Sequence, residues 1–316
     1  MRSTVRTVLI CLVVSLGVIV SAEKSWAGFV SGGSRLIYYY SQRSLVNPGA
    51  GSGTGATILA VKNNSSDATK VQMKIFNGST CAGFGPVTFD LPGNQSLRIN
   101  VSDHVSATPF PEGWVDLYAV NSGGTPIRWD YLTGKFTVLD FGGSSTTVAI
   151  SQAAAMFSDA NRSSDPQGGV IADNTDARTW APHLQSVDFW ATGGPFNISD
   201  RLVVVPVSSV PGTAPVASTS GIGLSFKTLA GAETLNTSAT TSCMLASSLP
   251  SLHPGFSASY PNGATVTDGG TLNLVADSSG TNKGNAGWLF EMATSPLLLG
   301  VHPIQAWAEL AVDGHE

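Results

Sequence analysis

Short runs of alternating apolar and polar residues, separated by turn signals, constrain the fold of this chain more than any other feature. The clearest run is Lys70–Phe76, where Val71, Met73 and Ile75 occupy alternate positions. Successive side chains of a β-strand point to opposite faces, so this period places the three on one buried face. Segments of about five to eight residues recur along the chain, which is typical of antiparallel sheets. The sequence therefore predicts an all-β fold.

The first part of the chain carries the most regular of these segments. The predicted strands there are Leu36–Tyr40, Thr57–Lys62, Lys70–Phe76, Val87–Leu91, Leu97–Val101, Gly113–Val120 and Lys135–Phe141. Thr57–Lys62 has apolar residues at consecutive positions, which predicts a strand covered on both faces. The sequence does not decide the secondary structure of Thr146–Phe157. Val148 and Ile150 alternate like a strand, whereas Ala153–Phe157 favours a helical turn or two.

The second part repeats this style after a polar stretch. Residues 158–179 have no apolar period and predict a linker or loop. The predicted strands beyond it are Ser186–Ala191, Arg201–Val207, Gly221–Leu229, Thr237–Leu245, Thr271–Ala276, Gly287–Met292 and a final segment within Leu297–Leu310. We predict two antiparallel β-sandwich-like domains, immunoglobulin-like or jelly-roll-like, over residues 28–157 and 180–316.

The first 27 residues have the organisation of a secretory signal peptide. Arg2 and Arg6 precede the largely apolar run Val8–Val20, and small residues stand at both key positions of Ser25-Trp26-Ala27. A membrane-spanning helix needs about 20 apolar residues, and this run is shorter. We expect cleavage after Ala27, with Val20-Ser21-Ala22 as the second choice of site. Because the sequence that follows has no apolar tail or sorting motif, we expect a secreted or periplasmic protein without a membrane span.

Cysteine usage agrees with export. Of the three cysteines, Cys11 lies in the signal peptide and leaves with it, so that Cys81 and Cys243 remain. In an oxidising compartment these two can form a disulfide that ties the two halves of the chain together. Two separate buried or free thiols are the alternative. Cys-x-x-Cys and paired-histidine spacings are absent from the sequence, and we predict no metal site.

Charge and composition exclude one large class of partner. Cleavage after Ala27 removes three of the 16 basic and one of the 21 acidic residues, which leaves a net charge of −7. A protein that binds nucleic acid needs a basic stripe to neutralise phosphates. We therefore predict no nucleic-acid partner, and no motif indicates a cofactor. The partners that we expect are cell-surface proteins or polysaccharides.

The sequence offers no catalytic constellation. The Gly-x-Ser-x-Gly elbow of many serine hydrolases does not occur. A glycosidase needs two carboxylates on either side of a cleft. Asp116, Asp130 and Asp140 lie within or beside predicted strands, where acids usually point to solvent or bind a turn backbone. We therefore expect structural roles for them and assign no catalytic residue.

Aromatic side chains are the best candidates for ligand contact. Of the seven tryptophans, six lie beyond the signal peptide. Trp114, Trp129 and Trp288 lie in or beside predicted strands and are expected in the core. Trp180 and Trp190 lie in the less regular central region and are the candidates for an exposed platform that could hold sugar rings.

Two stretches are similar to a recurrent type of exported bacterial β protein. One is Asp130–Asp140 with the later Ala153–Phe157, and the other is Gly287–Phe290 in the region after Cys243. On these residues the chain resembles exported bacterial β-sandwich proteins that have no assigned activity. The resemblance implies a secreted, sandwich-like protein and supplies no catalytic residues. We expect a non-enzymatic surface, envelope or matrix protein that acts by adhesion or assembly; the alternative is a carbohydrate-binding or polysaccharide-active secreted protein.

Overall fold

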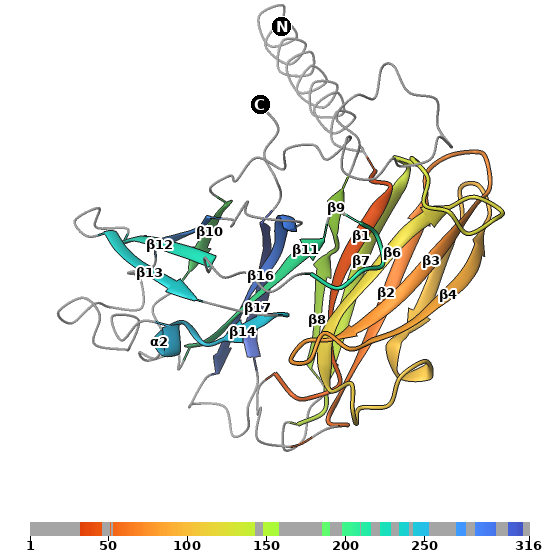
Figure 1. The fold of residues 1–316 in the computed structure, drawn as a ribbon. Helices are drawn as coiled ribbons and strands as arrows, with labels where there is room; N and C mark the ends of the chain where they lie inside the picture. Colours follow the sequence, from red (N-terminus) through yellow and green to blue (C-terminus); the bar gives the residue numbers. More distant parts are fainter. Residues whose placement is uncertain are drawn as a thin grey trace, which may run out of the picture.

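The computed structural model describes residues 32–45, 51, 53–142, 148–157, 185–189, 198–208, 210–215, 222–228, 234–239, 243–252, 270–275, 282–294 and 303–311. In these residues the protein is nearly all β, with 17 strands, one short 3-10 turn at Val101–Asp103 (η2) and one four-residue helix at Leu249–Leu252 (α2). The strands pair antiparallel within four sheets (Figure 1). The predicted all-β class is therefore confirmed.

The first half of the chain forms two of these sheets. The five-stranded sheet has the order β4 (Gly83–Leu91), β3 (Thr69–Asn77), β6 (Glu112–Val120), β1 (Arg35–Ser41) and β9 (Ala155–Phe157). The sheet opposite it has the order β5 (Ser96–Asn100), β2 (Gly55–Asn63), β7 (Leu132–Asp140) and β8 (Val148–Ala153). The two sheets contact each other through β1, whose Tyr38 hydroxyl donates to the Ala60 carbonyl on β2 at 3.2 Å.

The second half forms the other two sheets. One has the order β14 (Leu245–Ser247), β11 (Ile198–Ser208), β16 (Asn282–Thr294) and β17 (Pro303–Ala311). The other has the order β10 (Gln185–Phe189), β15 (Gly270–Val275), β12 (Ile222–Thr228) and β13 (Thr234–Ala239). Each predicted strand of this half overlaps an observed one, and most bounds differ by a few residues.

Pairing settles the segment that the sequence left open. Ala153 pairs with Lys135 on β7, and Ala155 pairs with Ile37 on β1. A helical turn would satisfy its own backbone groups, whereas in the fold two different strands satisfy them. The described part of the segment, residues 148–157, is therefore strand, split between β8 and β9 on the two facing sheets.

Burial follows the predicted period on β3 and departs from it on β2. Val71, Met73 and Ile75 are all fully buried. On β2, Leu59 and Val61 are buried, but the other face is only half-buried and ends in the exposed Lys62. The predicted coverage of β2 on both faces is therefore wrong, because the outer face of its sheet is partly open to solvent. Two other strands, β1 and β6, are buried on both faces.

Residues of both halves share one hydrophobic core, and this explains the double burial of β1. The ring of Tyr39 on β1 lies 5.1 Å from that of Phe290 and 6.4 Å from that of Trp288, both on β16. The Trp288 indole also donates from Nε1 to the Ala153 carbonyl at 3.1 Å. Val203 and Val205 of β11 belong to the same cluster.

Some predictions of organisation stay untested. The signal peptide, residues 1–27, and the linker, residues 158–179, lie outside the described residues. The division into two sandwich domains also stays a prediction. Within the described part of the chain, none of the helices has the length and apolar character required to cross a membrane.

Candidate functional site

A buried ion pair fixes a segment of the second half onto the outer face of the five-stranded sheet. Arg35 on β1 donates from Nε and Nη2 to the two carboxylate oxygens of Asp116 on β6, at 2.8 and 2.6 Å. The Gly212 amide donates to Asp116 Oδ2 at 2.7 Å, and Arg35 Nη1 donates to the Ser208 carbonyl at 2.7 Å. Charged groups out of water need such complete pairing. This pair therefore holds Ser208 and Gly212 in place.

A second charged cluster joins β1, β6 and β11. Glu112 accepts from the Tyr39 hydroxyl at 2.7 Å and from Arg201 at 2.5 and 2.6 Å. Burial raises the pKa of Tyr39 well above its ordinary value, and the charge of Glu112 adds to this. Burial opposes the charge of Arg201, but Tyr39 and Glu112 outweigh it and raise the pKa of the guanidinium. The cluster is thus a fixed contact of neutral tyrosine with paired ions.

A disulfide makes the third link between the halves. Cys81 follows β3 in the turn before β4, and Cys243 precedes β14. The two are bonded, with their Cα atoms 5.2 Å apart and a sequence separation of 162. Of the two states that the sequence left open for these cysteines, the structure has the disulfide.

The acids that lie in or beside the strands of the first half bind structural partners. Asp130 accepts from the Ser34 hydroxyl at 2.7 Å. Asp140 accepts from the backbone amides of Leu45 and Gly142 at 2.5 and 2.9 Å. With Asp116 in its ion pair, all three are buried and occupied in joining separate segments. Each of the three thus binds a partner from another segment of the chain, and none of them points to solvent.

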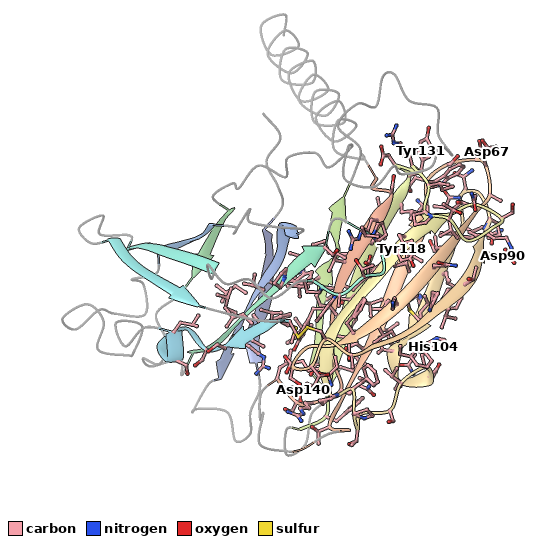
Figure 2. All side chains as sticks on the ribbon, in the orientation of Figure 1. Asp67, Asp90, His104, Tyr118, Tyr131 and Asp140 are labelled. Atoms are coloured by element: carbon pink, nitrogen blue, oxygen red, sulfur yellow. A yellow bond between two sulfur atoms is a disulfide. The ribbon has the colours of Figure 1, made fainter. Side chains whose placement is uncertain are left out.

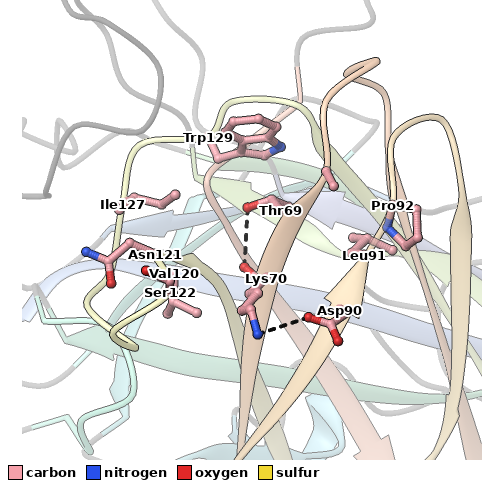
Figure 3. Close-up of a pocket in the computed structure, with 11 residues that line it drawn as sticks. Thr69, Lys70, Asp90, Leu91, Pro92, Val120, Asn121, Ser122, Ile127 and Trp129 are labelled. Carbon is pink, nitrogen blue, oxygen red and sulfur yellow. Dashed lines mark hydrogen bonds and ion pairs between the residues drawn. The ribbon is translucent and has the colours of Figure 1, made fainter.

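One groove in the described residues combines an apolar floor with exposed charged side chains. It lies where β3 begins and where β4 and β6 end, and its volume is about 440 Å³ (Figure 3). The lining residues are Ala68, Thr69, Lys70, Asp90, Leu91, Pro92, Val120, Asn121, Ser122, Ile127 and Trp129. The segment after β6 forms one of its walls.

Packing and hydrogen bonds fix the floor of the groove. Val120 and Ile127 are buried, and Trp129 is 8% exposed. The Trp129 indole donates from Nε1 to Asn63 Oδ1 at 3.1 Å, and its backbone amide donates to the Ser34 hydroxyl at 2.6 Å. These bonds hold Trp129 by its side chain and its backbone, so this part of the floor is formed in advance of any ligand.

The rim of the groove carries polar groups that are open to solvent. Lys70 Nζ lies 3.1 Å from Asp90 Oδ1, and the two side chains are 45% and 80% exposed. On the opposite wall, the side-chain oxygen of Asn121 accepts from the backbone amides of Gly123 and Thr125, at 2.9 and 3.0 Å. This turn orders the rim beside the exposed Ser122. Lys70, Asp90 and Ser122 therefore line the groove with a cation, an anion and a hydroxyl (Figure 3). Asp90 belongs to β4, the edge strand of its sheet (Figure 2).

Sequence reasoning located only part of this site. Trp114, Trp129 and Trp288 are buried as expected, and Trp129 also lines the groove. Trp180 and Trp190, the predicted platform, lie outside the described residues. Lys70 and Asp90 were not singled out, because each lies on its own strand and only the β3–β4 pairing brings them opposite each other. The other wall could have been predicted from the turn-forming residues Asn121–Gly124, which follow β6.

The described residues hold no group of three or more histidine, cysteine, aspartate or glutamate side chains arranged to hold a metal ion.

No known protein family matches the chain, and no curated protein is similar to it. Among solved structures, the chain is similar to one titled "Crystal Structure of Thermotoga maritima 1070". The identity is 10% and the TM-score 0.27, over 40% of this chain and 95% of that chain. A likeness this weak carries no argument about fold or function.

Proposed function

We propose that this is an exported, non-enzymatic protein that acts by binding a surface or envelope component, with the groove at the ends of β3, β4 and β6 as its contact site. The observation that carries the proposal is the position of the charged groups. Arg35 and Asp116 pair with each other, and Glu112 pairs with Arg201, in contacts that reach the second half, whereas Lys70 and Asp90 form an exposed pair at the groove.

The rigidity of the groove supports a binding role. Ligand sites are mostly apolar, with a few placed polar groups, and commonly enclose about 300–1,000 Å³. A volume of about 440 Å³ falls in this range. Because Trp129 is held by hydrogen bonds from its side chain and its backbone, a ligand meets a floor that is already ordered. Such preorganisation lowers the entropy that binding costs.

Assembly by strand addition is a weaker interpretation of the same sheet. The strand β4 lies at the edge of the five-stranded sheet, and an edge strand can pair with another chain. However, Pro86 lies within β4, and the register shifts between Met73 and Ile75 on its partner β3. Proline and bulges are the devices by which edge strands avoid such pairing. This favours the groove as the contact site.

A sedimentation assay tests the proposal. Protein lacking residues 1–27 is mixed with isolated cell-envelope fragments of the source organism, and the bound fraction is measured. We expect saturable binding that Ser122→Trp lowers at least tenfold, because the indole would fill the groove. Ser151→Trp is the matched control, since Ser151 is exposed on β8 of the opposite sheet. Absence of saturable binding, or equal binding by both variants, would show the proposal to be wrong.

A further inference from the structure

We propose that the groove binds a pyranose ring and that Lys70 and Asp90 recognise two adjacent hydroxyl groups of the sugar. This inference rests on the proposed function, which it deepens by naming the class of ligand. It draws on the spacing of the two charged side chains, on their exposure and on the apolar floor beside them.

The spacing of the charged pair suits a vicinal diol. Lys70 Nζ is a donor and Asp90 Oδ1 an acceptor, and they lie 3.1 Å apart on neighbouring strands. Each sugar hydroxyl both donates and accepts, so one hydroxyl can accept from the ammonium while its neighbour donates to the carboxylate. Adjacent hydroxyls on a pyranose ring are themselves about one hydrogen-bond length apart. The pair and the diol therefore match in both distance and polarity.

The floor suits the other face of a sugar. The ring carbons of a pyranose bear hydrogens that form an apolar surface, while the hydroxyls project around its edge. Val120, Ile127 and Trp129 line the groove, and the small exposed part of each residue, 1%, 5% and 8%, forms its apolar floor. Ser122 on the rim adds a hydroxyl that can bond a further sugar oxygen. An apolar floor with a polar rim is thus complementary to a ring with an apolar face and a polar edge.

The exposure of the pair favours a sugar over a wholly apolar ligand. Lys70 and Asp90 are 45% and 80% exposed and therefore hydrated. An apolar group that covered them would remove their water without replacing its hydrogen bonds, which is costly for charged groups. Sugar hydroxyls replace those bonds. Because an exposed ion pair contributes little to stability, turning either side chain towards a ligand costs the fold little.

Titration with simple glycosides tests the inference. The probes are methyl α-glucopyranoside, methyl α-mannopyranoside, methyl β-galactopyranoside and N-acetylglucosamine, followed by tryptophan fluorescence and saturation-transfer NMR. We expect at least one probe to saturate, and its 2-deoxy or 3-deoxy form to bind at least tenfold more weakly. Asp90→Asn and Lys70→Met should each weaken binding at least tenfold, with the thermal unfolding midpoint unchanged.

The controls use residues of the same type outside the groove. Asp67→Asn lies in the exposed turn before β3, and Lys62→Met is exposed on β2. Both controls should bind within twofold of the unaltered protein. If no probe saturates, or if Asp67→Asn weakens binding as much as Asp90→Asn, the inference is wrong. If no probe saturates while Ser122→Trp still abolishes envelope binding, the proposed function stands; if both tests fail, both are wrong.

Discussion

Replacing Asp116 should cost more stability than replacing any exposed acid of the chain. The carboxylate is 1% exposed and accepts three hydrogen bonds, two from Arg35 and one from the Gly212 amide. In Asp116→Ala the Arg35 guanidinium stays buried on β1 without its counter-charge. Breaking one partner of a buried pair costs about 3–5 kcal/mol. Because folded domains are stable by about 5–15 kcal/mol, this is a large share of the total.

The assay is equilibrium unfolding in urea at pH 7 with the disulfide intact, supplemented by hydrogen exchange. We expect the free energy of unfolding to fall by about 3–5 kcal/mol in Asp116→Ala, and by less in Asp116→Asn, which keeps the shape and one acceptor. The Gly212 amide should exchange faster in Asp116→Ala, which has no side-chain acceptor, since the amide donates to Asp116 Oδ2.

The matched control is Asp90→Asn, which breaks the exposed pair with Lys70. Exposed pairs contribute about 0–1 kcal/mol, so this variant should unfold almost like the unaltered protein. If Asp116→Ala and Asp90→Asn lose equal stability, or if Gly212 stays protected in Asp116→Ala, then the buried pair does not hold Ser208 and Gly212 and the reasoning is refuted. Should the alanine variant fail to accumulate, the asparagine variant alone answers the question.

Three further predictions concern stability. Replacing Cys81 and Cys243 together by serine should lower the free energy of unfolding by about 2–5 kcal/mol, since the bond closes a loop with a sequence separation of 162; an unchanged urea midpoint would contradict this. Burial raises the pKa of Tyr118 to about 12, with a further contribution from Asp116, so between pH 10 and 12 the unfolded chain binds fewer protons than the folded one. Stability should then decline with rising pH by at most about 1.4 kcal/mol per pH unit for this tyrosine, because solvent screens a partly exposed group. Tyr118→Phe should make the decline measured in urea less steep; an identical slope would count against burial of the Tyr118 hydroxyl as the cause. Gly113→Ala should destabilise strongly, because its Cβ would overlap the backbone of β3, whereas Gly123→Ala, which meets only a side-chain oxygen at 3.3 Å, should stay within about 0.5 kcal/mol in the same assay.

The sequence predicted local structure well where the chain's own pattern decides it. Val71, Met73 and Ile75 alternate in the sequence and are buried together on β3. Side-chain direction along a strand is a local property, so the pattern carries it. The ambiguity of Thr146–Phe157 marks the limit of this reasoning. Its residues suit two backbone states, and pairing with β7 and β1, both distant in sequence, selects the strand.

The sequence did not predict which faces of two strands, β2 and β1, are covered by other parts of the protein. We expected β2 to be covered on both faces, and its outer face proved partly open, whereas β1 is buried on both faces. Burial of an outer face depends on what packs against it. For β1 the covering elements come from the second half: Trp288 and Phe290 of β16 pack against Tyr39, and the Arg35–Asp116 pair binds the Gly212 amide.

The candidate site shows the same division between local pattern and distant contact. Sequence reasoning placed Trp129 in the core, which agrees with its exposure of 8%, but the groove beside it depends on Lys70 and Asp90 from paired strands. Composition and alternation by themselves determined an antiparallel all-β protein with two cysteines able to pair. The tertiary structure decided that they are bonded, which strand faces are covered, and where charged side chains surround an apolar floor. The physical reason is that the tendency of a segment to form a strand depends on residues next to each other in the sequence. Burial, strand pairing and pocket shape depend on segments that are distant in the sequence and meet only in the folded protein.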